Sequence, residues 1–279
     1  MNDFIISSLN KLKEKKIPNP EIDLRVLLNY SKYSQYSKYQ IILNNFDLDQ
    51  ININLFNKAL NRRLANEPIS KIINKKNFWK DDFFVNKFVL DPRPETEGIV
   101  EESLKLINNK QGNLRILDIG TGSGAIAISL AREFINASIL AIDISDEAIK
   151  VANKNVISKK LNNQIQFKKT TIDYINEKFD LIVSNPPYLT KKELENISYE
   201  IRNYEPIIAL DGGHDGLDFY REFARKIYKL MNINSYLILE IGAKQFMACK
   251  EIFSVSRLNF HKKTQDLKKK DRILVYSKL

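Results

Sequence analysis

From residue 114 to the C-terminus, short apolar runs alternate with amphipathic segments. The runs have the length of buried strands, and the segments between them carry apolar residues at helical spacing. Strands that alternate with helices in this way form a parallel sheet that is covered on both faces. The sequence therefore predicts an α/β fold, with strands at 115–119, 138–144, 164–169, 179–184, 235–241 and 272–277 and helices at 123–134, 146–157 and 215–231.

The region before this repeat has a different character. Residues 1–75 carry apolar stripes at helical spacing, and we expect them to form a small helical domain. Residues 76–91 are rich in aromatic and β-branched side chains with a polar break at Asn86-Lys87, which predicts a β-hairpin linker. The third part, 92–279, is expected to open with a helix at 95–107 after the prolines of "DPRPETE".

Composition excludes several classes of protein. The 279 residues include one cysteine and two histidines, so an intrachain disulfide is impossible and we expect no metal site. No run of about 18 consecutive apolar residues occurs, and no targeting segment is visible, so we expect a cytoplasmic protein without a membrane partner. The net charge of +10 suits contact with nucleic acid, but lysine is abundant along the whole chain, which favours an ordinary solvated surface.

The first strand of the repeat ends in a glycine-rich turn, "LDIGTGSGAIAISLA". Glycines between a strand and a helix let a ligand approach the backbone and the positive end of the helix. Their spacing differs from the G-x-G-x-x-G of dinucleotide folds. Asp143 ends the next strand, where an acid can accept hydrogen bonds from a ribose diol. A ribose without a pyrophosphate fits S-adenosylmethionine, and NAD is the alternative cofactor.

A second motif, "NPPY", follows the strand at 179–184. Ligands bind at the carboxyl ends of strands in open α/β sheets, so Asn185 is expected beside the glycine loop. The prolines restrict the backbone, so that the Asn185 side chain and the Pro186 carbonyl can accept hydrogen bonds from a substrate NH2 group. Tyr188 can pack on a flat group. This pattern favours methylation of a planar amide or amino nitrogen through positioning and electrostatics.

Further motifs make the chain resemble one known family over nearly its whole length. With "PRPETE", "DLIVSNPPY", "YEPIIALDGGHDGLDFYR" and "YLILEIG", it is similar to the release-factor glutamine methyltransferases (HemK-type). The resemblance implies a class I S-adenosylmethionine-dependent methyltransferase with a Rossmann-like seven-stranded sheet. It also implies methyl transfer to the side-chain amide nitrogen (N5) of the glutamine in the Gly-Gly-Gln motif of peptide chain release factors, with S-adenosylhomocysteine as the cofactor product. The helical domain would bind the release factor.

The same resemblance implies roles for individual residues. Arg93 and Glu95 of "PRPETE" are expected at the substrate entrance, and Asp91 stands where the family usually has an apolar residue. Catalysis and substrate binding are expected at Asn185, Pro186, Pro187 and Tyr188. The expected cofactor-binding residues are Gly120, Thr121, Gly122, Ser123, Gly124, Asp143, Asn185 and Tyr174, whose ring would lie beside the adenine.

Three other functions compete with this interpretation. NPPY also occurs in enzymes that methylate the amino groups of nucleic acid bases, but these require base extrusion and a basic channel, and "PRPETE" places acids near the entrance. We therefore expect no direct nucleic-acid substrate. Glutamine methylation of a ribosomal protein is a second alternative. A non-catalytic binding module of the translation apparatus is the third, and the intact glycine loop and NPPY motif argue against it.

Overall fold

The computed structural model describes residues 3–32 and 51–279. The chain divides into two compact units, Met1–Lys75 with Tyr199–Tyr204, and Lys76–Ser198 with Glu205–Leu279. Part of the expected helical domain, 33–50, lies outside the described residues. Among the residues that are described, no helix is both long and apolar enough to cross a bilayer.

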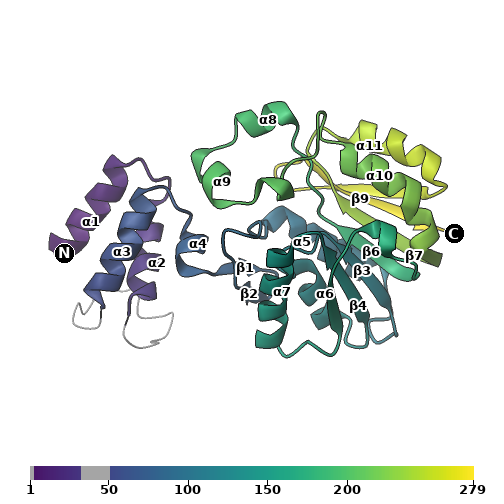
Figure 1. The fold of residues 1–279 in the computed structure, drawn as a ribbon, viewed down its shortest axis with the longest axis horizontal. Coiled ribbons are helices and arrows are strands. Elements are labelled where there is room, and N and C mark those ends of the chain that lie inside the picture. The colour runs from purple at the N-terminus through teal and green to yellow at the C-terminus, as the bar shows by residue number, and fades with distance from the viewer. Residues whose placement is uncertain (1–2, 33–50) are drawn as a thin grey trace. The chain divides into compact units, whose positions relative to one another are not determined.

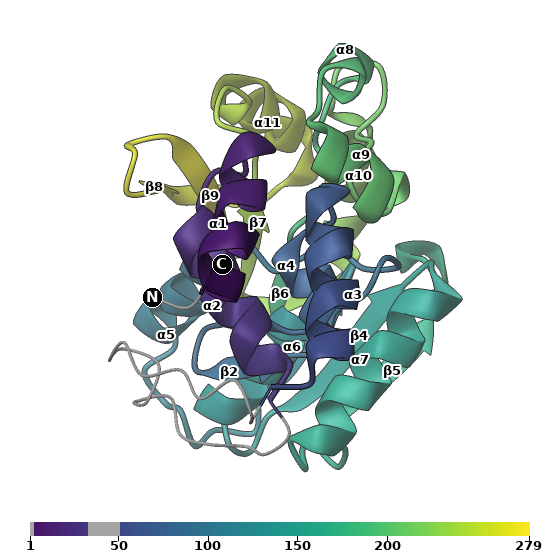
Figure 2. The ribbon, with the colours of Figure 1, turned by 90° about the vertical axis from the view of Figure 1, so that its left-hand side faces the viewer.

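The smaller unit is built from short helices, of which α1 to α3 can be followed in Figure 2. Their apolar stripes meet in a core around Leu12, Leu27 and Phe56, which are fully buried. Arg63 is also buried and donates hydrogen bonds to Asp23 at 2.6 Å and to Glu200 at 2.7 Å. This ion-pair network attaches a helix that is distant in sequence. The helices are α1 (Asp3–Glu14), α2 (Pro20–Tyr30), α3 (Ile53–Leu64), α4 (Ile69–Ile73) and α9 (Tyr199–Tyr204).

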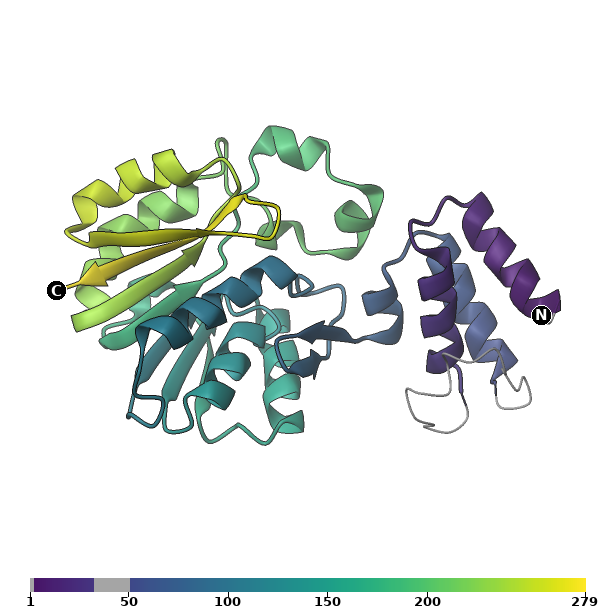
Figure 3. The same cartoon turned by 180° about the vertical axis from the view of Figure 1, so that it is seen from behind.

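The larger unit contains a seven-stranded sheet in the order β5-β4-β3-β6-β7-β9-β8 (Figure 1). The first five strands in this order are parallel, and β9 runs antiparallel between β7 and β8 at the edge seen in Figure 3. The predicted α/β fold is confirmed. The strands are β3 (Arg115–Ile119), β4 (Ser138–Asp143), β5 (Ile165–Lys169), β6 (Phe179–Ser184), β7 (Met231–Glu240), β8 (Asn259–Gln265) and β9 (Asp271–Lys278).

Helices cover both faces of the sheet. On one face lie α5 (Glu97–Leu106), α6 (Ala125–Glu133) and α7 (Asp146–Ser158), and on the other α10 (Asp218–Lys226) and α11 (Phe246–Phe253). The polar residues therefore gather at the ends of the strands, because both faces are apolar. The remaining short helices are α8 (Lys191–Glu195), η3 (Pro94–Thr96), η4 (Ile172–Tyr174), η5 (Ile207–Ala209), η6 (Ile227–Leu230) and η7 (Ser254–Ser256).

Two local predictions differ from the structure. The helix expected at 215–231 is α10 followed by η6, and Met231 already begins β7. The hairpin consists of β1 (Lys76–Phe78) and β2 (Asp81–Phe83), so its turn is at Trp79-Lys80. The polar break at Asn86-Lys87 belongs to a separate turn after the hairpin, in which the N–H of Phe88 donates to the Asn86 side chain at 3.0 Å. Trp79, in this turn, adopts a φ of 54°, and it donates a backbone hydrogen bond to Glu97 at 2.8 Å and a ring N–H hydrogen bond to Glu133 at 2.7 Å. These are contacts between segments distant in sequence.

Candidate active site

A cavity of about 280 Å³ lies at the carboxyl ends of β3, β4 and β6 in the larger unit. The segment 88–92, which the sequence assigned mainly to a linker, forms part of its wall, and the buried Asp91 belongs to that wall. The structure thus brings three separate motifs to one cavity. The predicted site residues that line it are Arg93, Gly120, Thr121, Gly122, Ser123, Asp143, Asn185 and Pro187.

The glycine loop is attached to the neighbouring strand through its backbone. The N–H groups of Gly120 and Thr121 both donate to the carbonyl of Ile142, at 2.9 and 3.0 Å. Gly120 has a φ of +72°, and a Cβ added there would meet no atom within 4 Å, so this face of the turn is open to a ligand. At Gly124 the Cβ would lie 3.2 Å from Phe167, and this residue does not line the cavity. Gly124 therefore serves close packing, which differs from its predicted contact with cofactor.

Two acids support this loop. Asp143 accepts hydrogen bonds from the N–H groups of Gly122 and Ser145, each at 2.9 Å, and burial raises its pKa. A carboxylate has about four acceptor positions, so Asp143 keeps capacity for a diol. Asp118 is fully buried and accepts from the Thr121 hydroxyl at 2.6 Å, and burial raises the pKa of Asp118 to about 7. The hydrogen bond to the buried Asp118 therefore fixes the Thr121 side chain towards the core.

Tyr174, which the resemblance places beside the adenine, does not line the cavity in this structure. Its side chain is 73% exposed. From the same short helix, Ile172 turns inward and contributes to the wall, as does Ile144 after β4. A single turn of 3-10 helix cannot point both residues to the same side, so burial of Ile172 leaves Tyr174 in solvent. The apolar part of the lining includes these isoleucines and the phenylalanines Phe78, Phe88, Phe219 and Phe223.

A chain of hydrogen bonds runs beneath the NPPY motif. The Asn185 side-chain NH2 donates to the Thr96 hydroxyl at 2.9 Å, and that hydroxyl donates to the Glu240 carboxylate at 2.5 Å. The Tyr188 hydroxyl is 3.4 Å from the other Glu240 oxygen, which is a long contact. Burial raises the pKa of Tyr188 to about 12, so its hydroxyl stays protonated. Neither Pro186 nor Tyr188 lines the cavity.

Neither Thr96 nor Glu240 is among the site residues predicted from the sequence. A signal for Glu240 existed, since it is the one acid in the apolar run "YLILEI" and it ends the strand next to β6. Carboxyl ends of adjacent parallel strands lie side by side. Thr96 carried no such signal, because it belongs to a short helix whose position depends on the tertiary fold.

The segment at 210–216 supports Tyr188 from behind. The Gln245 side chain donates to the carbonyls of Tyr188 and Gly216, at 3.0 and 2.9 Å. A Cβ on Gly212 would lie 2.8 Å from the Cα of Tyr188, so only glycine permits this approach. This packing gives the "ALDGGHDG" stretch a physical role.

Arg93 and Glu95, the two site residues predicted in "PRPETE", lie in different surroundings. Arg93 lines the cavity, and its guanidinium donates to both carboxylate oxygens of Glu205 at 2.8 Å. Glu95 is partly buried and does not line the cavity, and its charge contributes to the raised pKa of Glu240. The geometry is compatible with an entrance role for Arg93, and it places Glu95 towards the buried network.

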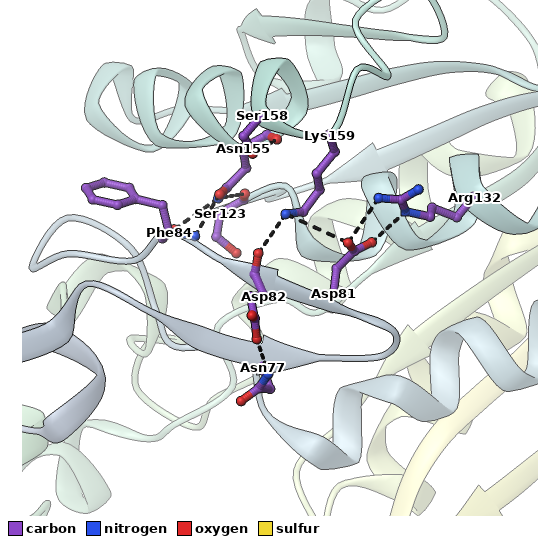
Figure 4. Close-up of polar contacts among 9 residues, drawn as sticks. All are labelled: Asn77, Asp81, Asp82, Phe84, Ser123, Arg132, Asn155, Ser158 and Lys159. Atoms are coloured by element: carbon purple, nitrogen blue, oxygen red, sulfur yellow. Dashed lines mark hydrogen bonds and ion pairs between the residues drawn. The ribbon is translucent and has the colours of Figure 1, made fainter. Parts of the chain in front are cut away.

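The residue that follows the hairpin, Phe84, is joined to the glycine loop by one side chain of α7 (Figure 4). The buried Asn155 accepts from the N–H of Phe84 at 2.7 Å and donates to the carbonyls of Phe84 and Ser123, at 3.0 and 2.9 Å. Lys159 and Arg132 bind the hairpin nearby, through the Asp82 carbonyl and the Asp81 carboxylate. The hairpin and the cofactor-side loop therefore share a support.

Comparisons with known proteins agree with this geometry. A family model described as the methyltransferase small domain matches residues 103–202. The release factor glutamine methyltransferase of Buchnera aphidicola is 38% identical, over 84% of this chain and 83% of that protein. In fold, the solved hMettl16 catalytic domain with MAT2A 3'UTR hairpin 6 is similar, with a TM-score of 0.56 at 19% identity over 70% of this chain and 74% of that one.

The likeness extends beyond the catalytic sheet. The release factor glutamine methyltransferase of Caulobacter vibrioides is 36% identical over 269 residues, which are 95% of this chain and 92% of that protein. A match at this level includes the helical unit, the hairpin and the cavity alike. The chain therefore belongs to the release factor glutamine methyltransferase family.

Proposed function

We propose that this chain transfers a methyl group from S-adenosylmethionine to the side-chain amide nitrogen (N5) of the glutamine in the Gly-Gly-Gln motif of peptide chain release factors. One observation carries the proposal beyond the names of the relatives. The glycine loop, Asp143 and Asn185 line a single cavity, so a cofactor and a substrate NH2 group can meet there.

The residues present fit S-adenosylmethionine. Asp143 offers acceptor capacity for a ribose diol, and the open face of Gly120 lets a ligand approach the backbone. Ile144 and Ile172 provide apolar surface for a flat base. When bound, S-adenosylmethionine supplies a methyl group on a cationic sulfur, whose carbon–sulfur bond is exchanged for a carbon–nitrogen bond to leave S-adenosylhomocysteine.

The chain's own contribution is to orient a poor nucleophile. The lone pair of an amide nitrogen is delocalised, so the reaction gains from acceptors that hold both N–H bonds in a fixed direction. Asn185, which lines the cavity, can supply one acceptor through Oδ1. We assign the second to the backbone carbonyl of Pro186, which stands between the cavity-lining residues Asn185 and Pro187, and the two prolines hold the backbone. The nitrogen gives up a proton after transfer, and we assign its removal to water because Tyr188 is itself protonated.

We also propose that the helical unit binds the release factor. Residues 1–75 contain 12 Lys and Arg against 7 Asp and Glu, which suits an acidic partner surface. Charge reversal at the exposed Arg25 and Lys58 should raise KM for the intact factor and leave cofactor affinity unchanged. An unchanged KM in both variants would contradict this role.

The main experiment uses labelled S-adenosylmethionine with a recombinant release factor, with the same factor after replacement of its motif glutamine, with ribosomes, and with DNA and RNA. Label on the intact factor that disappears with the glutamine replacement supports the proposal. Asn185→Ala should abolish the label, whereas the control Asn153→Ala, on the exposed surface of α7, should retain it. Label only on ribosomes or only on nucleic acid overturns the proposal in favour of one of the alternatives.

A further inference from the structure

The network beneath Asn185 joins residues that are far apart in sequence. Thr96 and Glu240 are 3% and 1% exposed, so water does not compete for their hydrogen bonds. Thr96 lies between Asn185 and Glu240, at 2.9 Å from the amide nitrogen and 2.5 Å from a carboxylate oxygen. The Tyr220 hydroxyl donates to the Glu240 backbone carbonyl at 2.9 Å and holds the end of β7 in place.

The direction of these hydrogen bonds follows from the chemistry of the groups. An ionised carboxylate only accepts, so the single proton of the Thr96 hydroxyl is directed to Glu240. The Thr96 oxygen must then accept from Asn185, which requires the NH2 group of the asparagine on that side. Asn185 Oδ1 is left on the opposite side, without a hydrogen-bond partner among the described residues. The two ends of an asparagine amide have nearly the same shape, so packing alone does not select this orientation.

We infer that Thr96 and Glu240 are positioning residues, which set the side-chain amide of Asn185 so that its oxygen, and not its NH2 group, is presented to the substrate. The inference rests on the proposed function, because an acceptor at this position matters only if the substrate group is an NH2. If the Asn185 amide were reversed, its NH2 group would face the NH2 group of the substrate. Both groups are donors, so the hydrogen bond that orients the nucleophile would be lost.

The surroundings of Glu240 make this orientation sensitive to pH. Burial raises the pKa of Glu240 to about 7. The hydrogen bond from Thr96 and the positive charge of Arg272 act in the opposite direction and lower this pKa. The charge of Glu95 raises this pKa further, and the hydrogen bond from the Tyr188 hydroxyl lowers it. Once protonated, the acid can donate to Thr96, whose own proton is then free for Asn185 Oδ1. The ionised form favours the productive orientation, so activity should fall as the pH drops through about 7.

A pair of variants at Thr96 tests the inference. Thr96→Val keeps the shape but removes the hydroxyl, and kcat should fall about 10- to 100-fold, the loss expected for a hydrogen bond in a buried network. Thr96→Ser keeps the hydroxyl and should stay within about 3-fold of the wild type, a difference of about 0.6 kcal/mol. Glu240→Gln can donate as well as accept, so its kcat should be reduced and should not change between pH 6 and 8. S-adenosylmethionine affinity should be unchanged in all three variants.

Two results would overturn the inference. One is wild-type kcat in Thr96→Val. The other is an equal loss of kcat in Thr96→Ser and Thr96→Val, which would indicate that Thr96 acts through its packing and not through its hydroxyl.

Nuclear magnetic resonance of the Asn185 side-chain NH2, assigned with Asn185→Asp, gives a readout without substrate. Slow hydrogen exchange of one amide proton in the wild type and its loss in Thr96→Val support the network, and equal exchange refutes it. If the wild type does not label the release factor, the proposed function alone fails, since this measurement still decides the orientation.

Discussion

Replacement of the buried Glu240 by glutamine should stabilise the protein at high pH. The carboxyl is 1% exposed, and burial raises its pKa from 4.5 to about 7, so the folded chain holds the proton more tightly than the unfolded chain does. The resulting stabilisation is fully present below pH 4.5 and is lost as the pH rises through 7. At about 1.4 kcal/mol per pKa unit, the loss is about 3 kcal/mol. Glu240→Gln carries no ionisable group at this position, so the variant should not lose this stability as the pH rises.

The assay is urea unfolding at pH 5 and pH 8, followed by the fluorescence of Trp79. This is the single tryptophan and lies in the larger unit, so the smaller unit does not contribute to the signal. The free energy of unfolding of Glu240→Gln minus that of the wild type should be about 2–3 kcal/mol more positive at pH 8 than at pH 5. Glu251→Gln, at an exposed position, should show no such change. A difference that is independent of pH, or larger at pH 5, would refute the argument.

Three further outcomes are expected. Asp143→Asn should weaken S-adenosylmethionine binding about 10- to 100-fold in isothermal titration calorimetry, because a charged acceptor is lost, and an unchanged Kd would contradict the role. Gly216→Ala should lower the melting temperature more than Gly120→Ala does. Both glycines have a positive φ, but only a Cβ added at Gly216 would overlap Tyr188, because it would lie 2.4 Å from the Tyr188 carbonyl oxygen. Equal losses of melting temperature in the two variants would exclude this overlap as a cause. Asn155→Ala should destabilise the larger unit by about 2–4 kcal/mol in urea unfolding, because it leaves the buried Ser123 carbonyl and two part-buried backbone groups of Phe84 unpaired. A loss below about 0.5 kcal/mol would contradict this.

Local patterns were sufficient for most of the sheet, including the edge strand β5, but not for the opposite edge strand β8. The parallel strands β3, β4 and β6 are mostly apolar and mostly buried along their length, since both of their faces are covered. In contrast, β8 has the sequence NFHKKTQ, with exposed and half-buried residues in alternation, and it was not predicted as a strand. An edge strand is covered on fewer sides, so its sequence carries a weaker signal.

The sequence by itself determined the α/β class, the glycine loop, the ribose acid and the asparagine-proline motif, because each depends on residues within one strand and the turn that follows it. Only the tertiary structure decided which side chains meet at the site. Asn185, Thr96 and Glu240 come into contact from segments 89 and 144 residues apart, and Tyr174 turns away from the cavity that its neighbour Ile172 lines. The physical reason is that local sequence sets backbone conformation, whereas the partners of a buried polar group depend on how distant segments pack.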